Sequence, residues 1–486
     1  MAFDVFGLRD RVVGEYRDYV QSFVHVRDPR VNDYVRTMLD SGELWPDAVL
    51  QLNPAYESSE TLGELADKGV IAADTARFFG RDIRLHRHQR EAIEAARASD
   101  HYVVSTGTGS GKSLAYLVPI VDHVLKNRPE DHSVRAIIVY PMNALINSQL
   151  ATLQAFAKNW PGCPLTFGRY TGQDRGKDRD RILTDPPHIL LTNYVMLEYM
   201  LIRPTDRALI HQATRAVKFL AIDELHVYRG RQGADVAMLM RRVRQRAGRD
   251  DLLCIGTSAT LVSGENRSDS RTKIAQVGAR LFGVTVKPER IIGETLRRVT
   301  KFTAPATREA LRAAIEAPTP TATVDAVARH PLAAWVETTF GLDVDGDGIL
   351  VRRKPIAFED GLKRLVEQSG LPAERCRASL KAILDAGNAA EQRPGEPVFA
   401  FRLHQFLASG GSVYTTLEAP DRRSFSTEGQ FYAPEEEDRA EHQLGPSMVA
   451  FQVRPSGSPR ATKSESAKTY PIGSSRGTTT TPRSRS

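Results

Sequence analysis

Short apolar runs alternate with amphipathic helical stretches along the middle of the chain. Stretches such as 86–98 and 234–247 carry apolar residues at the three- and four-residue spacing of a helix with one buried face. The apolar runs, several of them rich in β-branched residues, occur at 101–106, 135–141, 188–193, 219–224 and 252–258. Continuous apolar strands that alternate with helices are typical of a sheet covered by helices on both faces. The pattern therefore predicts an α/β domain with a doubly wound, mostly parallel sheet over residues 81–295.

The segments on either side of this domain have other patterns. Residues 1–80 show helical spacing, which predicts an N-terminal helical region. Residues 296–435 are rich in alanine and helical spacing, interrupted by the Pro/Thr-rich stretch 317–323, and we expect a mainly helical accessory region. From 436 to 486 the apolar pattern fades into Ser, Thr, Pro and Arg, a composition that buries too little surface to offset its ordering entropy. We therefore predict a disordered basic tail there.

The net charge adds little to the functional argument. The 486-residue chain carries a formal +7, but residues 453–486 hold seven Lys/Arg against one Glu. The rest of the chain is therefore close to neutral, at about +1. Evidence for a nucleic-acid partner must come from motifs.

Cysteine use and hydropathy indicate the compartment. Cys163, Cys254 and Cys376 lie far apart and form no CxxC pair, which argues against a disulfide framework or a zinc site. The first twenty residues mix acids and arginines, unlike a signal peptide. No run approaches the length of apolar sequence that a membrane span needs. We expect a cytoplasmic protein without a membrane partner.

A glycine-rich turn follows the first predicted strand and precedes a helix. The glycines let the backbone bend so that its N–H groups point at a phosphate, and the helix directs its positive end to the same place. Lys112 can reach the β- and γ-phosphates, and the Ser113 hydroxyl can hold Mg²⁺. The alternative, a turn without ligand, rests on Thr106 standing where the strict pattern has glycine. The predicted ATP-binding residues here are Thr106, Gly107, Thr108, Gly109, Ser110, Gly111, Lys112 and Ser113.

An acidic doublet, Asp223 and Glu224, ends a later apolar strand. Ligands bind at the carboxyl ends of strands in open α/β sheets. Asp223 is suited to bind Mg²⁺ and Glu224 to polarise an attacking water, with His226 as a further candidate near the γ-phosphate. Such a doublet alone is usually a solvated loop. Beside a phosphate loop it predicts an ATPase site in which the two segments end on adjacent strand tips.

These residues resemble superfamily 2 DEAD/DEAH-box helicases. TGTGSGKS resembles their motif I, DELH their motif II, and the segment Ser258, Ala259 and Thr260 their motif III, which couples ATP to nucleic acid. Gln89, at the end of LHRHQ, resembles the adenine-reading Q motif, and His86 could replace the aromatic ring that stacks on adenine. The wider DELHVYRGRQGADVAMLMRR context resembles the YprA-like branch. The resemblance implies a RecA-like, P-loop NTPase fold, ATP and Mg²⁺ as cofactors, and DNA as the partner.

Motifs Ia, Ib and Ic of this family contact the nucleic-acid backbone. YPMNALINSQ resembles motif Ia, and two shorter segments resemble Ib and Ic in the expected order. What the resemblance implies for this chain is a set of nucleic-acid-binding residues, namely Pro141, Asn143, Thr171, Gly172, Thr192 and Asn193.

The second RecA-like domain of the family, which carries motifs IV to VI, has no counterpart in the sequence pattern. The string 245–249 copies motif VI, but it lies between motifs II and III, and we interpret it as a basic helix face that ends at Gly248. We therefore expect a truncated product of a longer gene, the ATP-binding half of a helicase or translocase. Alternatives are a non-catalytic module that binds nucleic acid or a partner, or one half of a split motor in DNA repair or phage defence, with a separately encoded second RecA domain.

The acidic segment 343–348 imitates the start of a calcium loop. Lys354 stands where the loop needs a bidentate Glu, so we reject calcium and predict an acidic turn between two elements.

Overall fold

The computed structural model describes residues 4–22, 29–42, 44–107, 109–127, 133–174, 177–259, 267–302, 306–393, 395–408, 412–416, 425–426 and 448–452. The chain divides into two compact units. One contains residues 50–402, and the other contains residues 1–49 and 403–486. All residues predicted for the site lie in the larger unit, residues 50–402.

A parallel sheet forms the centre of the larger unit. Among the described residues it has seven strands in the order β11-β5-β10-β9-β6-β8-β7, and every neighbouring pair is parallel. The strands are β5 (Tyr102–Ser105), β6 (Ala136–Tyr140), β7 (Phe167–Tyr170), β8 (Ile189–Asn193), β9 (Phe219–Ile222), β10 (Leu253–Ser258) and β11 (Ile291–Gly293). The sequence pattern predicted the five inner strands. It missed β7 and β11, the two edge strands, because an edge strand is short or only half-buried and lacks a continuous apolar run.

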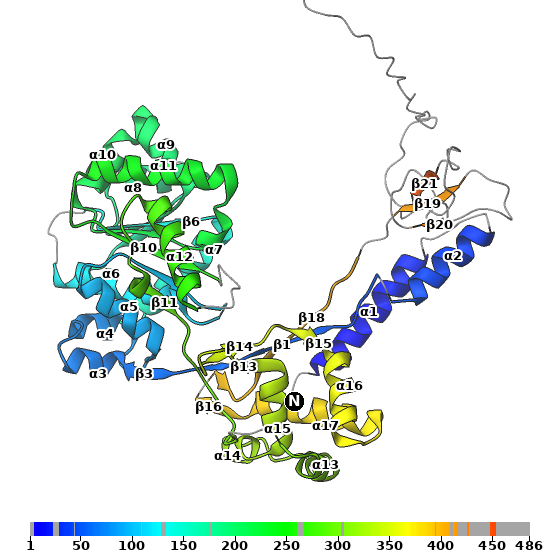
Figure 1. The fold of residues 1–486 in the computed structure, drawn as a ribbon. Coiled ribbons are helices and arrows are strands. Elements are labelled where there is room, and N and C mark those ends of the chain that lie inside the picture. The colour runs from blue at the N-terminus through cyan, green and yellow to red at the C-terminus, as the bar shows by residue number, and fades with distance from the viewer. Residues whose placement is uncertain are drawn as a thin grey trace, which may run out of the picture. The chain divides into compact units, whose positions relative to one another are not determined.

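Helices cover both faces of the sheet (Figure 1). Successive strand residues point to opposite faces. Val104, Ile138 and Leu191 therefore join one buried cluster, and Val103, Ile137 and Leu190 join the other. The helices after β5 to β10 are α6 (Lys112–Lys126), α7 (Asn143–Ala157), α8 (Lys177–Thr184), α9 (Tyr194–Ile202), α10 (Arg207–Ala216), α11 (Gly230–Ala247) and α12 (Arg267–Phe282), and α5 (Arg87–Arg97) precedes β5.

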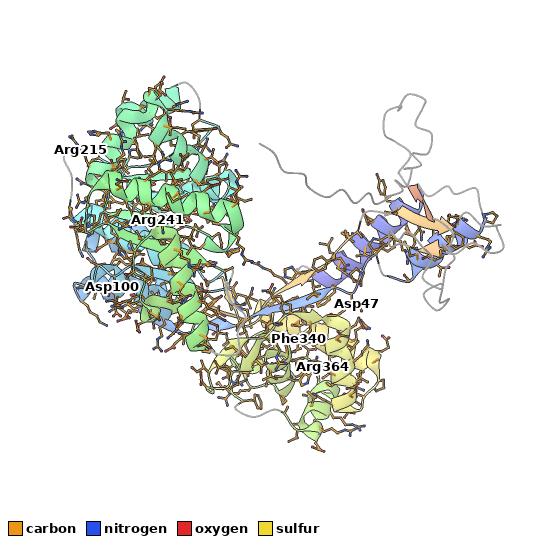
Figure 2. All side chains as sticks on the ribbon, turned by 45° about the horizontal axis from the view of Figure 1, so that its top comes forward. Asp47, Asp100, Arg215, Arg241, Phe340 and Arg364 are labelled. Atoms are coloured by element: carbon orange, nitrogen blue, oxygen red, sulfur yellow. The ribbon has the colours of Figure 1, made fainter. Side chains whose placement is uncertain are left out.

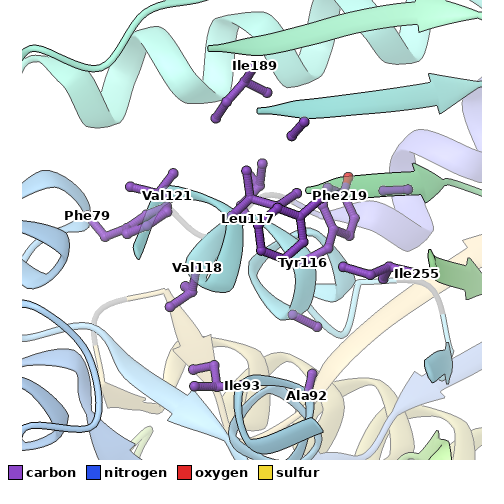
Figure 3. Close-up of a cluster of buried hydrophobic side chains, with 14 of the residues drawn as sticks. Phe79, Ala92, Ile93, Tyr116, Leu117, Val118, Val121, Ile189, Phe219 and Ile255 are labelled. Atoms are coloured by element: carbon purple, nitrogen blue, oxygen red, sulfur yellow. The ribbon is translucent and has the colours of Figure 1, made fainter. Parts of the chain in front are cut away.

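The first of these clusters lies under α5 and α6 (Figure 3). Tyr116, Leu117 and Val121 of α6 are fully buried against strand residues such as Phe219 and Ile255. This packing fixes the start of α6, and with it the glycine-rich loop, against the sheet. The fold-class prediction is confirmed: the domain is a RecA-like, doubly wound α/β structure.

The basic string at 245–249 lies at the end of α11. The helix ends at Ala247, and Gly248 follows with φ +58°, the left-handed conformation typical of a helix C-cap. The prediction of a helix face that ends at Gly248 is confirmed.

Short strands and small helices precede and follow the sheet domain along the chain of the larger unit. Strands occur between 49 and 61, a part for which the pattern predicted helices, because VLQLN alternates buried and half-buried positions with a period of two. The elements before β5 are β1 (Val49–Asn53), β2 (Ala55–Tyr56), β3 (Ser58–Thr61), α3 (Leu62–Asp67), α4 (Ala73–Phe79) and β4 (Arg84–His86).

The accessory part that follows the sheet is mainly helical. Phe340 is fully buried there against Gly361, where a Cβ atom would lie 2.1 Å from the phenyl ring (Figure 2). Its helices are α13 (Arg308–Glu316), α14 (Val324–Ala328), α15 (Pro331–Val336), α16 (Phe358–Ser369) and α17 (Ala373–Ala389), with a π-turn at Glu337–Gly341. Its strands are β12 (Leu296–Arg297), β13 (Leu342–Val344), β14 (Leu350–Arg352), β15 (Ile356–Ala357), β16 (Glu391–Arg393), β17 (Glu396–Pro397) and β18 (Ala400–His404).

The predicted acidic turn at 343–348 joins two antiparallel strands. β13 and β14 pair through Asp343 and Val351 at the centre of the register. The Asp345 carboxylate accepts the backbone N–H groups of Asp347 and Ile349 and so closes the turn. The prediction of a turn between two elements is confirmed.

The described residues of the smaller unit form two helices and a short sheet. Val31, Val35 and Leu39 of the second helix pack with Trp45. The elements are α1 (Val5–Ser22), α2 (Pro29–Asp40), β19 (Ser412–Thr416), β20 (Phe425–Ser426) and β21 (Met448–Gln452). β21 lies within the range predicted as a disordered tail, and residues 453–486 lie outside the described residues. Helices long and apolar enough to span a bilayer are not found in the described part of the chain.

Candidate nucleotide and nucleic-acid site

The glycine-rich loop connects β5 to the N-terminus of α6. Gly109 and Gly111 have φ of +81° and +71°, a left-handed conformation that favours glycine, and Gly111 is the N-cap of α6. These turns leave the backbone N–H groups at the start of α6 without helical partners, which makes a cradle for an anion. Gly109 and Gly111 therefore make the tight turns that a phosphate-binding loop would need. Thr108 lies outside the described residues.

Thr106, at the position where the strict pattern has glycine, contributes a hydrogen bond. Its hydroxyl lies 2.6 Å from the Ser110 hydroxyl, and both side chains are buried. Its backbone N–H donates to the Ser258 carbonyl at 3.3 Å. Thr106 thus closes the loop with a side-chain bond, and glycine is not required there.

Gln89 and His88, at the start of α5, support the loop from outside. The Gln89 amide nitrogen donates to the Gly111 carbonyl at 2.8 Å, and its oxygen accepts the His86 backbone N–H at 2.8 Å. The His88 Nε2–H donates to the Ser110 carbonyl at 2.9 Å. Burial lowers the pKa of His88 to about 4, so the ring is neutral at pH 7. The predicted adenine-reading Gln89 is therefore also a structural support of the loop.

Lys112 and the acidic doublet meet across the end of the sheet. The Lys112 Nζ lies 3.7 Å from Glu224 Oε1 and 3.4 Å from the Thr106 carbonyl. Both contacts are long, so the ammonium group keeps most of its donor capacity for a ligand. The two segments do not lie on adjacent strand tips as predicted, because β10 lies between β5 and β9. The short strand spacing still lets the Lys112 side chain reach Glu224 across β10.

Asp223 is a buried carboxylate that forms no ion pair with any of the described residues. Burial raises the pKa of Asp223 to about 6, and a hydrogen bond from the Thr257 hydroxyl opposes this rise. The same Thr257 hydroxyl accepts the Glu224 backbone N–H at 3.2 Å. Thr257 was missed by the sequence analysis, although it directly precedes the motif III residues. It fixes both members of the doublet.

Glu224 has a strained backbone and two side-chain neighbours. Its φ of +55° is one of two positive values found for non-glycine residues in the described part of the chain. Its carboxylate lies 3.2 Å from His226 Nδ1, and that nitrogen lies 3.3 Å from the Ser258 hydroxyl. The structure thus brings His226 between the doublet and Ser258 of motif III, whose hydroxyl also donates to the Ala259 carbonyl. Thr260 lies outside the described residues.

The residues at this end suit Mg²⁺ bound together with a triphosphate. Ser113 is the second residue of α6, and Asp223 follows β9, so both offer hard oxygen ligands at the phosphate loop. A cation would favour the ionised form of Asp223, whose pKa burial raises. Across the described ranges there is no cluster of three His, Cys, Asp or Glu side chains that could hold a metal unaided. Phosphate oxygens and water would have to complete the coordination shell.

The predicted nucleic-acid residues lie at the carboxyl ends of β6, β7 and β8. The Asn193 amide donates to the Asn143 side-chain oxygen at 2.8 Å and so joins motifs Ia and Ic. The Thr192 hydroxyl donates to the Tyr170 carbonyl at 2.8 Å, and the Thr171 hydroxyl donates to Asp174 at 2.7 Å. The structure therefore gathers these segments at one edge of the sheet.

Exposure divides these residues into two groups. Thr192 and Thr171 are 0% and 2% exposed, so their side chains hold the loops in place and cannot reach a ligand. Pro141 and Asn143 are half-buried, and Gly172 is exposed. Contact with a nucleic-acid backbone would fall to these residues and to the backbone N–H groups of the loops.

A cavity of about 260 Å³ opens beside the phosphate loop. Tyr56 and His86 line it, with ring centroids 5.0 Å apart, together with Gly109 of the loop. Arg297, Gln392 and Glu396 of the accessory part are among the other lining residues. Tyr56 was missed by the sequence analysis because it lies thirty-three residues before Gln89 with no motif around it.

The fold and this end of the sheet define a P-loop nucleotide-binding domain of the helicase type. Residues 86–267 match the family model of the DEAD/DEAH box helicase, so the chain contains a DEAD/DEAH box helicase domain, as the motifs indicated. It is 27% identical to the Druantia protein DruE of Escherichia coli over 389 residues, 55% of this chain and 21% of that protein.

Two further similarities cover about half of the chain each. It is 29% identical over 224 residues to the uncharacterized ATP-dependent helicase YprA of Bacillus subtilis, covering 46% of this chain and 28% of YprA. The match to the crystal structure of the DUF1998 helicase MrfA bound to DNA covers 53% of this chain and 32% of the MrfA chain. Its TM-score is 0.42 and its sequence identity is 22%. The chain spans only about a quarter of the length of these curated relatives.

Proposed function

We propose that this chain is the ATP-binding half of an ATP-dependent DNA helicase or translocase. The observation that carries the proposal is the distance of 3.7 Å between Lys112 Nζ and Glu224 Oε1. Lys112 directly follows a glycine-rich loop in which Gly109 and Gly111 adopt left-handed turns. We propose DNA and not RNA as the nucleic acid because the segment around Glu224 resembles the YprA-like branch.

Each residue at this end has a role that its position supports. Lys112 would bind the β- and γ-phosphates, and Ser113 and Asp223 would hold Mg²⁺, whose charge offsets that of the phosphates. Glu224 would orient the attacking water and accept its proton. His226, between Glu224 and Ser258, would report the state of this site to motif III. The base would occupy the cavity lined by Tyr56 and His86.

We further propose that hydrolysis needs a second RecA-like domain. In P-loop enzymes an arginine from across the cleft contributes about 10³–10⁵ in rate. We expect the 486-residue chain alone to bind ATP with little hydrolysis and no unwinding. A separately encoded partner that carries motifs IV to VI would restore turnover. We also propose a cytoplasmic location. The three cysteines, all of them described, are free thiols, which fits a reducing compartment.

The test is Mg²⁺-dependent ATP binding by wild type, Lys112→Ala and Glu224→Gln, with and without single-stranded DNA. Lys112→Ala should weaken ATP binding by about 30- to 1,000-fold, the usual effect of removing one member of a buried charge contact. Glu224→Gln should bind ATP as wild type does. Lys301→Ala, which removes a half-exposed lysine paired with Asp325, is the matched control. Normal ATP binding by Lys112→Ala would refute the proposal.

A further inference from the structure

Helices α11 and α12, called here the basic helix pair, carry a large share of the positive charge of the chain. Their sequences hold nine Lys and Arg against two Asp, a net charge of +7. Residues 1–452 together carry about +1, so the rest of that range carries about −6. The charge of the chain is therefore unevenly distributed, which its total conceals.

The two helices pack side by side over the same buried cluster. Val236 and Met240 of α11 and Ile274 of α12 belong to this cluster. At the C-terminal ends of the helices, Arg244 Nη1 donates to the Gly283 carbonyl at 2.6 Å. Because the apolar side of each helix is turned to the sheet, the polar sides of both helices form one outward surface.

Most cations of this surface are not neutralised by the protein. Arg242 pairs with Glu198. Asp235 and Asp269 are exposed and form no ion pair with the described residues, so they weaken the positive potential without pairing with a particular cation. The cations that are exposed and form no ion pair with any described residue are Arg231, Arg246, Arg271, Lys273 and Arg280. Phosphates could replace the counterions of these side chains.

The character of this surface favours a nucleic acid over a protein as its ligand. Among the described residues of the two helices, Met238 is the one large hydrophobic residue that is exposed. A protein interface usually has an apolar core, whereas an interface with nucleic acid is polar and strongly positive. The surface has the second composition.

The same surface favours a duplex over a single strand. Proteins that bind single strands add aromatic side chains on which the bases stack. The sequences of the two helices contain one aromatic residue, Phe282, which is fully buried. Arg231 and Arg246 are separated by about 22 Å along α11, at the usual rise per residue of a helix. A rigid row of this length can contact several phosphates of a duplex, which carries one charge per about 1.7 Å.

We propose that the basic helix pair binds the phosphate backbone of double-stranded DNA. The choice of DNA rests on the proposed function, whereas the choice of an anionic duplex rests on the charges and exposure of the two helices. The site is additional to the proposed nucleic-acid segments at the ends of β6, β7 and β8. It binds without regard to sequence, because contacts to phosphates carry no base information. It anchors the duplex beside the ATP-binding domain while the motif segments hold or release a strand.

The test measures binding of a duplex of about 20 base pairs, without nucleotide, over a series of salt concentrations. The variant combines Arg246→Gln, Lys273→Gln and Arg280→Gln, since glutamine keeps the helix propensity without the charge. If each cation contacts one phosphate, the slope of log affinity against log salt should fall by about 3. The affinity at low salt should fall by about 10- to 100-fold. An unchanged affinity and slope would overturn the inference.

A matched control removes the same charge from another exposed surface of the larger unit. It combines Lys354→Gln, Lys363→Gln and Arg364→Gln, three exposed positions of the accessory part (Figure 2 labels Arg364). Its duplex affinity should stay within about twofold of wild type, because these cations lie outside the basic helix pair. Equal losses in both triple variants would show an effect of net charge alone and would refute the site.

Two further probes test the kind of polyanion. A single strand of the same length should bind more weakly than the duplex, and polyglutamate at equal charge concentration should not compete with it. If either binds as tightly as the duplex and loses its affinity in the helix-pair variant, the assignment to duplex DNA is wrong.

ATP binding separates this inference from the proposed function. The helix-pair variant should bind ATP as wild type does, and Lys112→Ala should keep duplex binding while it loses ATP. Normal ATP binding by Lys112→Ala would refute the ATP site and leave the duplex measurements to be judged alone. Loss of ATP binding in the helix-pair variant would show a disturbed fold of the domain and would count against a separate site.

Discussion

Two groups of polar side chains differ in how completely the protein itself satisfies their hydrogen bonds and charges. One group lies at the ends of β5, β9 and β10, and the other lies at the ends of β6, β7 and β8. Lys112 keeps contacts no shorter than 3.4 Å, and Asp223 has a pKa raised by burial. Thr192 and Thr171, in contrast, are buried and make hydrogen bonds of 2.8 and 2.7 Å within the protein.

The difference shows that a motif match can have two physical meanings. At the ends of β5, β9 and β10, Lys112 and Asp223 retain charge that a ligand would use, because among the described residues their ionic contacts are long. At the ends of β6, β7 and β8 the motif threonines hold neighbouring strands and loops together, and Asn143 and Gly172 are more accessible.

Asp223→Asn should have the largest effect. It removes a proposed Mg²⁺ ligand, and ATP affinity in the presence of Mg²⁺ should fall by about 30-fold or more. In wild type the Mg²⁺-dependent part of the affinity should decline as the pH falls through about 6, because protonation competes with the cation. Titration of ATP with and without Mg²⁺ at several pH values measures both. Mg²⁺ stimulation that persists in Asp223→Asn would contradict the assignment.

The raised pKa of Asp223 also predicts how the stability of the ligand-free protein depends on pH. Its folded pKa is raised, so its ionisation costs stability once the pH exceeds the unfolded value near 4, and the cost grows until the pH passes about 6. The unfolding free energy of wild type relative to Asp223→Asn should therefore decrease over this range. Denaturant unfolding at pH 4 to 7 measures it, and a flat difference would count against the raised pKa.

Tyr56→Ala should have the second largest effect. Loss of the ring from the cavity wall should weaken ATP by about three- to tenfold while leaving inorganic triphosphate unaffected. Competition binding with both ligands measures this, and Tyr19→Ala, a half-exposed tyrosine of α1, is the control. If the affinities for ATP and triphosphate fall equally, Tyr56 supports the phosphate loop and does not contact the base.

Thr192→Val and Asn143→Ala should separate structure from binding. Thr192→Val removes a buried hydrogen bond and should cost about 1–2 kcal/mol of unfolding free energy. Asn143→Ala removes a part-buried hydrogen bond with Asn193, so it should cost at most about 1 kcal/mol, and it should weaken single-stranded DNA binding by about two- to tenfold. Denaturant unfolding and DNA titration are the measurements, with the exposed Thr152→Val as control. The contrast fails if the two variants show the same pattern.

Thr257→Val should have the smallest effect. It removes the hydrogen bond that lowers the pKa of Asp223, so the pH at which Mg²⁺-dependent binding falls should move upward. ATP affinity at pH 8 should change by less than about threefold. A Thr257→Ser variant, which keeps the hydroxyl, should behave as wild type.

Local pattern alone determined the inner strands, the phosphate loop and the acidic doublet. Each of these depends on a few consecutive residues: apolar runs for β5 to β10, Gly109 and Gly111 for the turn, and Asp223 with Glu224 at the end of a strand. The half-buried edge strand β7 and the very short β11 left no such signal.

Only the tertiary structure decided how these pieces meet. The insertion of β10 between β5 and β9, the burial of Thr171 and Thr192, and the contact of Arg244 with the end of α12 all join residues far apart in the chain. Hydrophobic and turn signals act over a few residues, whereas such contacts depend on how whole layers pack. The sequence therefore determined which groups are candidates for the chemistry, and packing determined which of them remain accessible to a ligand.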